Sequence, residues 1–192
     1  MLFFTYYLVN HEYIFYMAKI ERTLIVFKPD SVQRGIVGEI LTRFERAGFK
    51  IVGAKMLQPS QKHYYHHYEE IGKMITRRGQ EAFDMTVRMM CEGPVIAFVI
   101  EGIEAVAMVR KMVGVTEPKA SLPGTIRGDY AHISFDYADS EKVGICNIIH
   151  ASGSQEDAEK EIDYWFSEPE LYSYETVYEK FTQRKNTDSK SL

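Results

Sequence analysis

The chain has 192 residues, of which 45% are hydrophobic and 13% aromatic, which is enough for the packed core of a single domain. Its net charge of -4 and its pI of about 5.9 argue against a protein that binds nucleic acid through bulk positive charge. Its cysteines, Cys91 and Cys146, form neither a C-x-x-C motif nor a disulfide framework. We therefore expect a reducing, cytoplasmic location.

The first residues of the chain are aromatic-rich, and the first basic residue among them is Lys19. They lack the basic start and the cleavage pattern of a signal peptide, and they are too short to span a bilayer. We expect an N-terminal extension over residues 1–17 that is disordered or loosely packed. A single domain over residues 18–183 and a polar tail over 184–192 should follow.

Apolar runs and helical spacings alternate along the domain and predict its elements in chain order. The predicted strands cover residues 22–27, 49–57, 95–100 and 143–149. The predicted helices cover residues 36–47, 61–71, 80–90, 104–113 and 155–166, and a long Pro/Gly-rich connection runs up to residue 129. This order contains a split βαβ pattern. It predicts an α/β (α+β) fold, a ferredoxin-like βαββαβ sandwich with a four-stranded antiparallel sheet covered by helices.

A histidine follows the last predicted strand, and small residues and a helix start come directly after it. The run 143–149 should deliver His150 at its end, and Ser154-x-x-Asp157 should begin the next helix. Imidazole is a good neutral nucleophile near pH 7, because its pKa is about 6.5. A helix start also favours an anion. His150 is therefore a candidate nucleophile, and the alternative is a buried histidine with a backbone partner.

Three cationic side chains could bind an anion, although each has an ordinary structural explanation. Lys28 ends the first strand, where a lysine can snorkel, and Arg110 lies near a helix C-terminus, where a cation is favoured anyway. Arg127 precedes Gly128 and could instead form a surface ion pair. The sequence has neither a P-loop nor a G-x-G-x-x-G motif, so side chains would have to hold any phosphate. The histidines at 63, 66 and 67 indicate a solvated helix face rather than a metal site.

Several motifs, in the same order, resemble the nucleoside diphosphate kinase family. Asn147-Ile148-Ile149-His150-Ala151-Ser152 resembles the family's N-x-x-H-[GA]-S signature. The similarity runs from about Ala18 to Phe166. It also includes Ile25-Val26-Phe27-Lys28-Pro29-Asp30, Thr116-Glu117-Pro118, Pro123-Gly124-Thr125-Ile126-Arg127-Gly128-Asp129 and Ala158-Glu159-Lys160-Glu161-Ile162.

The resemblance implies a ping-pong reaction in which His150 takes the γ-phosphate of a nucleoside triphosphate and passes it to a nucleoside diphosphate. It also implies a set of roles for the matching residues. Lys28 and Tyr68 would contact the transferred phosphoryl group, Arg110, Thr116 and Arg127 would hold the other phosphates, Asn147 would bind near the ribose 3′-hydroxyl, Glu161 and Ser152 would orient the imidazole, and Phe83 would stack on the base.

The family also implies a cofactor, ligands and an assembly. Mg²⁺ would be bound through the nucleotide phosphates and not by protein ligands. ATP and other nucleoside di- and triphosphates would be the ligands, and the chain would form a homo-oligomer, either a tetramer or a hexamer. Nucleic acid as a substrate and a membrane are not expected.

The sequence departs from the family pattern in three places. Gly153 stands where the family usually has Asp, which could loosen the turn after the histidine. The segment 71–90 is longer than usual and lacks a Pro-Phe-Phe pattern, and an insert covers residues 130–144. This insert could contact a nucleotide or a neighbouring subunit.

Two alternative functions belong to other classes. The first is an interaction or regulatory module that keeps the nucleotide-binding fold without the chemistry. Such a protein is expected to have lost His150, Lys28 or Arg127, yet all three are present. The second is DNA binding, and the acidic pI counts against it.

Overall fold

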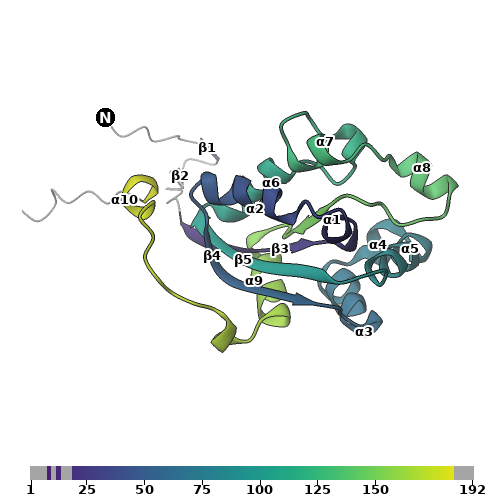
Figure 1. Cartoon of the computed structure of the whole chain (residues 1–192), viewed down its shortest axis with the longest axis horizontal. Coiled ribbons are helices and arrows are strands. Elements are labelled where there is room, and N and C mark those ends of the chain that lie inside the picture. The colour runs from purple at the N-terminus through teal and green to yellow at the C-terminus, as the bar shows by residue number, and fades with distance from the viewer. Residues whose placement is uncertain (1–7, 10–11, 14–18, 184–192) are drawn as a thin grey trace, which may run out of the picture.

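The computed structural model describes residues 8–9, 12–13 and 19–183 (Figure 1). A four-stranded antiparallel sheet in the order β4-β5-β3-β6 forms its centre. Its strands are β3 (Ile20–Phe27), β4 (Lys50–Leu57), β5 (Val95–Ile103) and β6 (Ile149–Ala151). β1 (Leu8–Val9) and β2 (Glu12–Tyr13) form a separate antiparallel pair. The rest of the predicted N-terminal extension and the predicted tail, 184–192, lie outside the described residues.

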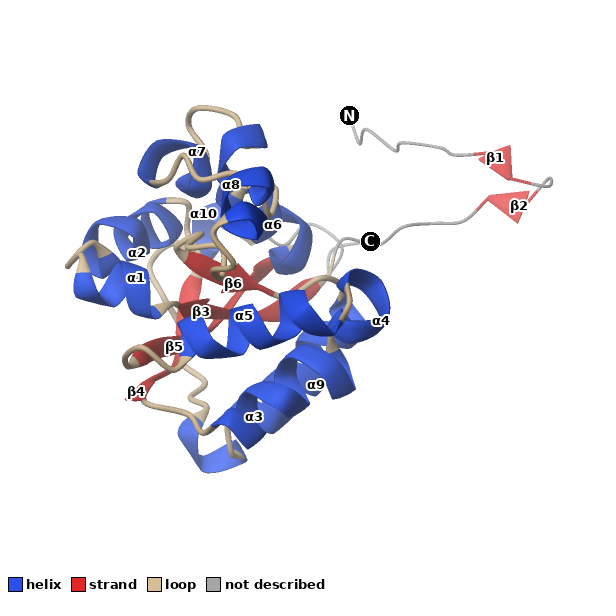
Figure 2. Cartoon of the chain, turned by 90° about the vertical axis from the view of Figure 1, so that its right-hand side faces the viewer, coloured by secondary structure: helices blue, strands red, loops and turns tan. Residues whose placement is uncertain are grey.

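Helices cover both faces of the sheet. Figure 1 shows α2, α6 and α7 on one face and α9 on the other, and Figure 2 shows the end of the molecule that carries α3, α4 and α5. The helices are α1 (Pro29–Gln33), α2 (Val37–Arg46), α3 (Gln61–Tyr65), α4 (Met74–Arg78), α5 (Gln80–Met90), α6 (Ala105–Val113), α7 (Ile126–Tyr130), α8 (Phe135–Ser140), α9 (Gln155–Trp165) and α10 (Glu179–Thr182), with a π-helical turn η1 (His66–Ile71) and 3₁₀ turns η2 (Pro118–Ala120) and η3 (Glu168–Glu170). None of these helices is long and apolar enough to cross a bilayer.

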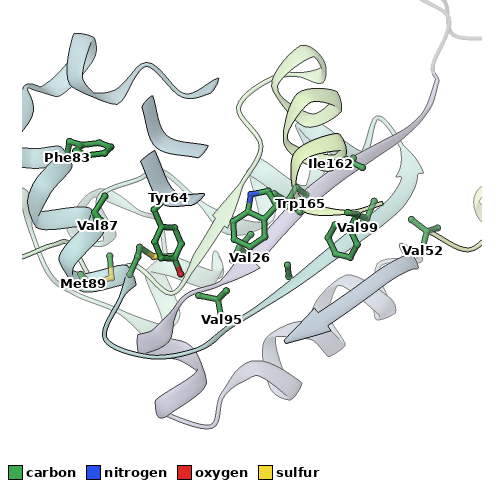
Figure 3. Packing of buried hydrophobic residues seen from close by; sticks show 14 residues of the cluster. Val26, Val52, Tyr64, Phe83, Val87, Met89, Val95, Val99, Ile162 and Trp165 are labelled. Carbon is green, nitrogen blue, oxygen red and sulfur yellow. The ribbon is translucent and has the colours of Figure 1, made fainter. Parts of the chain in front are cut away.

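The strand β3 contributes to the core on both faces of the sheet. Successive side chains of a strand point to opposite faces. Leu24 and Val26 accordingly belong to one buried cluster, and Ile25 and Phe27 belong to the other. Figure 3 shows Trp165 of α9 over Val26 in the first cluster. Because β3 is buried on both faces, its position is closely fixed, and so is the position of Lys28, which follows it.

The predicted fold class is confirmed, because the sheet is four-stranded, antiparallel and covered by helices. The predicted extent of the last strand is wrong. β6 covers only Ile149–Ala151, and His150 is its middle residue. The preceding run packs on α5 instead: a Cβ on Gly144 would lie 2.6 Å from the Cβ of Met89. A hydrophobic run alone does not distinguish a segment packed against a helix from one paired in a sheet.

Several short helices were not predicted from the sequence. α1, α4, α7 and α8 each have five or six residues, which is too few for helical periodicity to show. The N-caps of α7 and α8 are visible in the sequence, because Thr125 accepts a hydrogen bond from the N–H of Gly128 and Ser134 accepts one from the N–H of Tyr137. The predicted helix 61–71 is α3 continued by η1. Single π-helical turns are frequent at functional sites.

Candidate active site

A strained turn sets the direction of the chain just before His150. Ile148 has φ +76° and is fully buried. The N–H of Ile149 donates to the carbonyl of Asn147 over 2.8 Å, which closes a three-residue turn around it. A β-branched residue at positive φ is strained and needs support from its surroundings.

The end of β3 supplies that support. The carboxylate of Asp30 accepts the N–H of Ile148 at 3.0 Å, and the N–H of Lys28 donates to the carbonyl of Ile148 at 3.0 Å. Both hydrogen-bonding groups of the strained residue are therefore satisfied by the segment that follows β3. The turn brings Asn147 and His150 to the same cavity.

His150 is held by a buried carboxylate from α9. Its Nε2 lies 3.0 Å from Oε1 and 3.1 Å from Oε2 of Glu161, and its side chain is 20% exposed. The hydroxyl of Ser152 donates to Oε2 of Glu161 at 2.6 Å. A carboxylate on Nε2 favours the proton there and leaves a lone pair on Nδ1. The ring is therefore oriented as a nucleophile would need to be.

Glu161 is ionised at neutral pH although it is buried. Burial by itself would raise the pKa of this carboxyl group, but the charge of His150 and the hydrogen bonds from His150 and Ser152 lower it to about 2. A fixed negative charge therefore lies directly behind the imidazole. It can stabilise positive charge that develops on the ring.

Lys28, Asn147 and Arg127 form a hydrogen-bonded cluster beside the histidine. Nζ of Lys28 lies 2.7 Å from Oδ1 of Asn147, and Nδ2 of Asn147 donates to the carbonyl of Thr116 at 2.7 Å. Arg127 donates to three carbonyls, those of Asn147 at 3.2 Å, Gly114 at 3.1 Å and Ile149 at 2.6 Å. Arg127 thus joins the loop after α6 to both sides of the strained turn.

Lys28 and Arg127 are buried, and neither has an ion-pair partner among the described residues. Burial and then the charge of Arg127 lower the pKa of Lys28 to about 8, and burial and then the charge of Arg110 lower the pKa of Arg127 to about 10. Buried charges normally have partners. Their depressed pKa values indicate a site that an anion would complete.

The remaining residues predicted to contact phosphate line one cavity, which has a volume of about 630 Å³. Lys28, Arg127 and His150 line the same cavity. Arg110 lines it and donates to the carbonyl of Ser152 at 3.4 Å, and the exposed Thr116 lines it from the loop after α6. Tyr68 lines it from η1. Its hydroxyl is buried and makes no hydrogen bond within the described part of the chain, which is unfavourable unless a ligand provides one. Burial raises the pKa of Tyr68, so its hydroxyl stays protonated.

The insert 130–144 joins the two walls of this cavity. Next to Thr116 of one wall, the N–H of Phe135 donates to the carboxylate of Glu117 at 2.9 Å. On the other wall, the guanidinium carbon of Arg78 lies 3.8 Å from the centre of the Phe135 ring. Phe135, Ala138 and Asp139 line the cavity. The insert therefore faces the space where a ligand would bind.

Two sequence predictions fare differently here. Phe83 is only 6% exposed, packs edge-to-face on Tyr65 within the core and is absent from the cavity lining (Figure 3). Its base-stacking role stays a prediction, and this position argues against it.

The solvated face predicted for the histidines is wrong for His67, which is 2% exposed and contacts the ring of His150. Its spacing from Tyr64 and Ile71 was the available signal, because residues three and four apart share a helix face.

Comparison with known proteins agrees with this geometry. The family model for nucleoside diphosphate kinase matches residues 21–171. The chain belongs to the nucleoside diphosphate kinase family. A nucleoside diphosphate kinase of Borreliella burgdorferi is 41% identical over 159 residues, which cover 81% of this chain and 92% of that protein. Nucleoside diphosphate kinase B of Rattus norvegicus is 46% identical over 160 residues, 83% of this chain and 95% of that protein.

Solved structures of nucleoside diphosphate kinases are also similar. A transition-state mimic of the enzyme from Borrelia burgdorferi with bound vanadate and ADP aligns with a TM-score of 0.83 and 38% identity, over 85% of this chain and 97% of that one. The enzyme from Halobacterium salinarum in complex with CDP aligns with a TM-score of 0.72 and 34% identity, over 85% and 99% of the two chains.

The support given to the strained turn can be tested by changing Asp30 to Ala. The buried N–H of Ile148 would lose its acceptor, which should reduce the free energy of unfolding by about 1–3 kcal/mol. A shift of His150 should also slow phosphoryl transfer by roughly tenfold or more. Urea denaturation and steady-state rates measure both effects. Asp163→Ala, at an exposed position of α9, is the control. Equal stability of the Asp30 variant and the unmodified protein would contradict the role assigned to Asp30.

Proposed function

We propose that this chain is an active nucleoside diphosphate kinase that works by a ping-pong mechanism with a phosphohistidine on His150. The observation that carries the proposal is the orientation of one imidazole. Glu161 holds Nε2, so that the lone pair of Nδ1 is left for the cavity that Lys28, Arg110 and Arg127 line. A nucleophile, a carboxylate that orients it and cations for the phosphates are the parts that the reaction needs.

In the first half-reaction, Nδ1 of His150 attacks the γ-phosphorus of a nucleoside triphosphate. The bond from phosphorus to the β,γ-bridging oxygen breaks, and a nucleoside diphosphate leaves with that electron pair. The imidazole gains positive charge, which the carboxylate of Glu161 stabilises through Nε2–H. In the second half-reaction, a terminal oxygen of another diphosphate attacks the same phosphorus, and the bond to Nδ1 breaks.

The other residues bind and orient the nucleotide. Lys28 and the hydroxyl of Tyr68 contact the transferred group. Both line the cavity, Lys28 is buried, and the buried hydroxyl of Tyr68 has no hydrogen-bond partner among the described residues. Arg110, Thr116 and Arg127 hold the remaining phosphates. Asn147, which is fixed between Lys28 and the Thr116 carbonyl, binds near the ribose 3′-hydroxyl.

Mg²⁺ is proposed to arrive on the phosphates and to neutralise part of their charge. The cavity fits this arrangement, because the charged side chains that line it are mostly cationic and Glu161 is already bonded to His150 and Ser152. Lys28, Arg110 and Arg127 would hold the phosphates that carry the ion.

Family membership also supports a homo-oligomer, either a tetramer or a hexamer, with residues 18–183 as one domain. The backbone N–H of Tyr172 donates to the carbonyl of Val52 at 2.7 Å, so the segment after α9 is bonded to the sheet. The free cysteines Cys91 and Cys146 support a cytoplasmic location.

Labelling tests the phosphohistidine directly. The protein is incubated with γ-labelled ATP and Mg²⁺ and quenched in alkali, because phosphohistidine is labile in acid. We expect label on His150 that is transferred to added GDP. His150→Gln should abolish the label, whereas His132→Gln, in the exposed part of the insert, should keep it. Bound nucleotide without any transferable label would instead support the binding module that lacks chemistry.

The lowered pKa of Lys28 predicts a pH limit on activity. In the free protein, Lys28 is charged below about pH 8 and loses its charge as the pH rises through that value. Because kcat/KM reports ionisations of the free enzyme, it should fall above about pH 8, well before an ordinary lysine titrates. Lys28→Met should lower kcat/KM by roughly a hundredfold and remove this limb of the profile. Lys111→Met, next to Arg110 on α6, is the control. A wild-type profile that stays flat to about pH 10 would contradict the assignment.

A change at Phe135 tests whether the insert 130–144 contacts the nucleotide. If its ring contacts the nucleotide, Phe135→Ala should raise the KM for ATP roughly tenfold, as expected for loss of a base–aromatic contact, with little change in kcat. Tyr137→Ala, at an exposed position of the same helix, should behave like the wild type. An unchanged KM with a changed mass in light scattering would show that the insert contacts a neighbouring subunit instead.

A further inference from the structure

Two imidazoles, and not one, lie beside the carboxylate of Glu161. Nε2 of His150 is 3.0 Å from Oε1, and Nδ1 of His67 is 3.8 Å from the same oxygen. The centres of the two rings are 4.5 Å apart, and the rings are nearly perpendicular at 79°. If His67 carried a proton on Nδ1, it could compete with His150 for this carboxylate.

Trp165 prevents that competition. Its indole Nε1 lies 3.2 Å from Nδ1 of His67. An indole N–H can only donate, so Nδ1 must accept and must carry a lone pair. The proton of neutral His67 is therefore on Nε2. In this tautomer Nδ1 has nothing to donate to Glu161.

The surroundings of His67 also keep it neutral. Burial is the largest effect, and the positive charges of His150, His63 and Lys28 act in the same direction, while Glu161 opposes them. The ring of Tyr68 also packs against it, with centroids 4.7 Å apart. Together these groups lower the pKa of His67 to about 3. The tautomer fixed by Trp165 is therefore the form present at neutral pH.

We propose that His67 and Trp165 are positioning residues for the nucleophile. Trp165 holds His67 as the neutral Nε2–H tautomer, so that among the imidazoles only His150 donates to Glu161. Because Glu161 accepts from no other imidazole, the proton of His150 stays on Nε2, and Nδ1 is free to attack phosphorus. The inference rests on the function proposed for His150, and it adds two residues, from η1 and α9, that act on His150 through Glu161.

The tautomer can be measured in the unmodified protein by ¹⁵N NMR of labelled histidine. The His67 signals are assigned by their loss in His67→Gln. We expect the neutral Nε2–H form with no titration between about pH 5.5 and 8. Protonation of Nδ1, or titration of His67 within that range, would overturn the proposal. The measurement needs no nucleotide, so its result is independent of whether the protein transfers phosphate.

A double-variant experiment tests the consequence for chemistry. Trp165→Phe removes the donor, so His67 can carry a proton on Nδ1 and pair with Glu161. The rate of His150 phosphorylation should fall roughly tenfold near pH 6 and less near pH 8, because His67 protonates more readily in acid. His67→Phe in the same chain removes the competitor and should restore the pH profile of the unmodified protein. Tyr164→Phe, at the adjacent position, is the control.

Each result of this experiment decides the question. A merely structural role for Trp165 predicts the same loss at every pH and no recovery in the double variant, and either finding would refute the proposal. Thermal melting shows whether the variants fold, and if Trp165→Phe does not, the tautomer of His67 decides alone. Failure of the unmodified protein to form phosphohistidine would refute the proposed function and leave the tautomer result standing.

Discussion

The active site depends on one constrained backbone turn at Ile148. This buried, β-branched residue has φ +76°, and both of its backbone hydrogen-bonding groups are bonded to the segment that follows β3. The turn separates Asn147 from His150 by a reversal too tight for regular strand geometry. Because β3 is packed on both faces, its end is a rigid support for that reversal. Strain of this kind persists only where the surrounding structure over-determines it.

Uncompensated positive charge is the second constraint. Lys28 and Arg127 are almost fully buried, and in the described part of the chain neither forms an ion pair. Such an arrangement costs stability in the free protein, and a bound anion offsets that cost. A module without phosphate chemistry would gain stability by replacing these cations with apolar residues. Both line the same cavity as the Tyr68 hydroxyl, which has no hydrogen-bond partner among residues 19–183. Their burial there is therefore better explained by a phosphate ligand than by folding.

The sequence predicted those parts of the site that lie on long, regular elements. β3 and α9 have clear apolar patterns, so the positions of Lys28 and Glu161 followed from them, and the fold class followed from the element order. Short-range geometry was not predictable. The strained turn displaced the last strand to Ile149–Ala151, and the insert packed as a helix against Arg78. His67 was read as solvated because its polarity outweighed its position on the buried side of η1. A single polar side chain does not reveal a partner that lies 98 residues away, as Trp165 does.

Glu161 connects these observations, because its carboxylate is held, through Ser152, by the same strand that positions the buried Lys28. The hydroxyl of Ser152 donates to Glu161 at 2.6 Å and accepts the backbone N–H of Leu24 at 3.2 Å. Leu24 lies within β3 and Lys28 directly follows that strand, so the carboxylate bonded to His150 and the buried lysine of the cavity share a rigid reference. Precise positioning is the main contribution that a protein can make to phosphoryl transfer, since the chemistry itself needs little covalent help beyond the histidine.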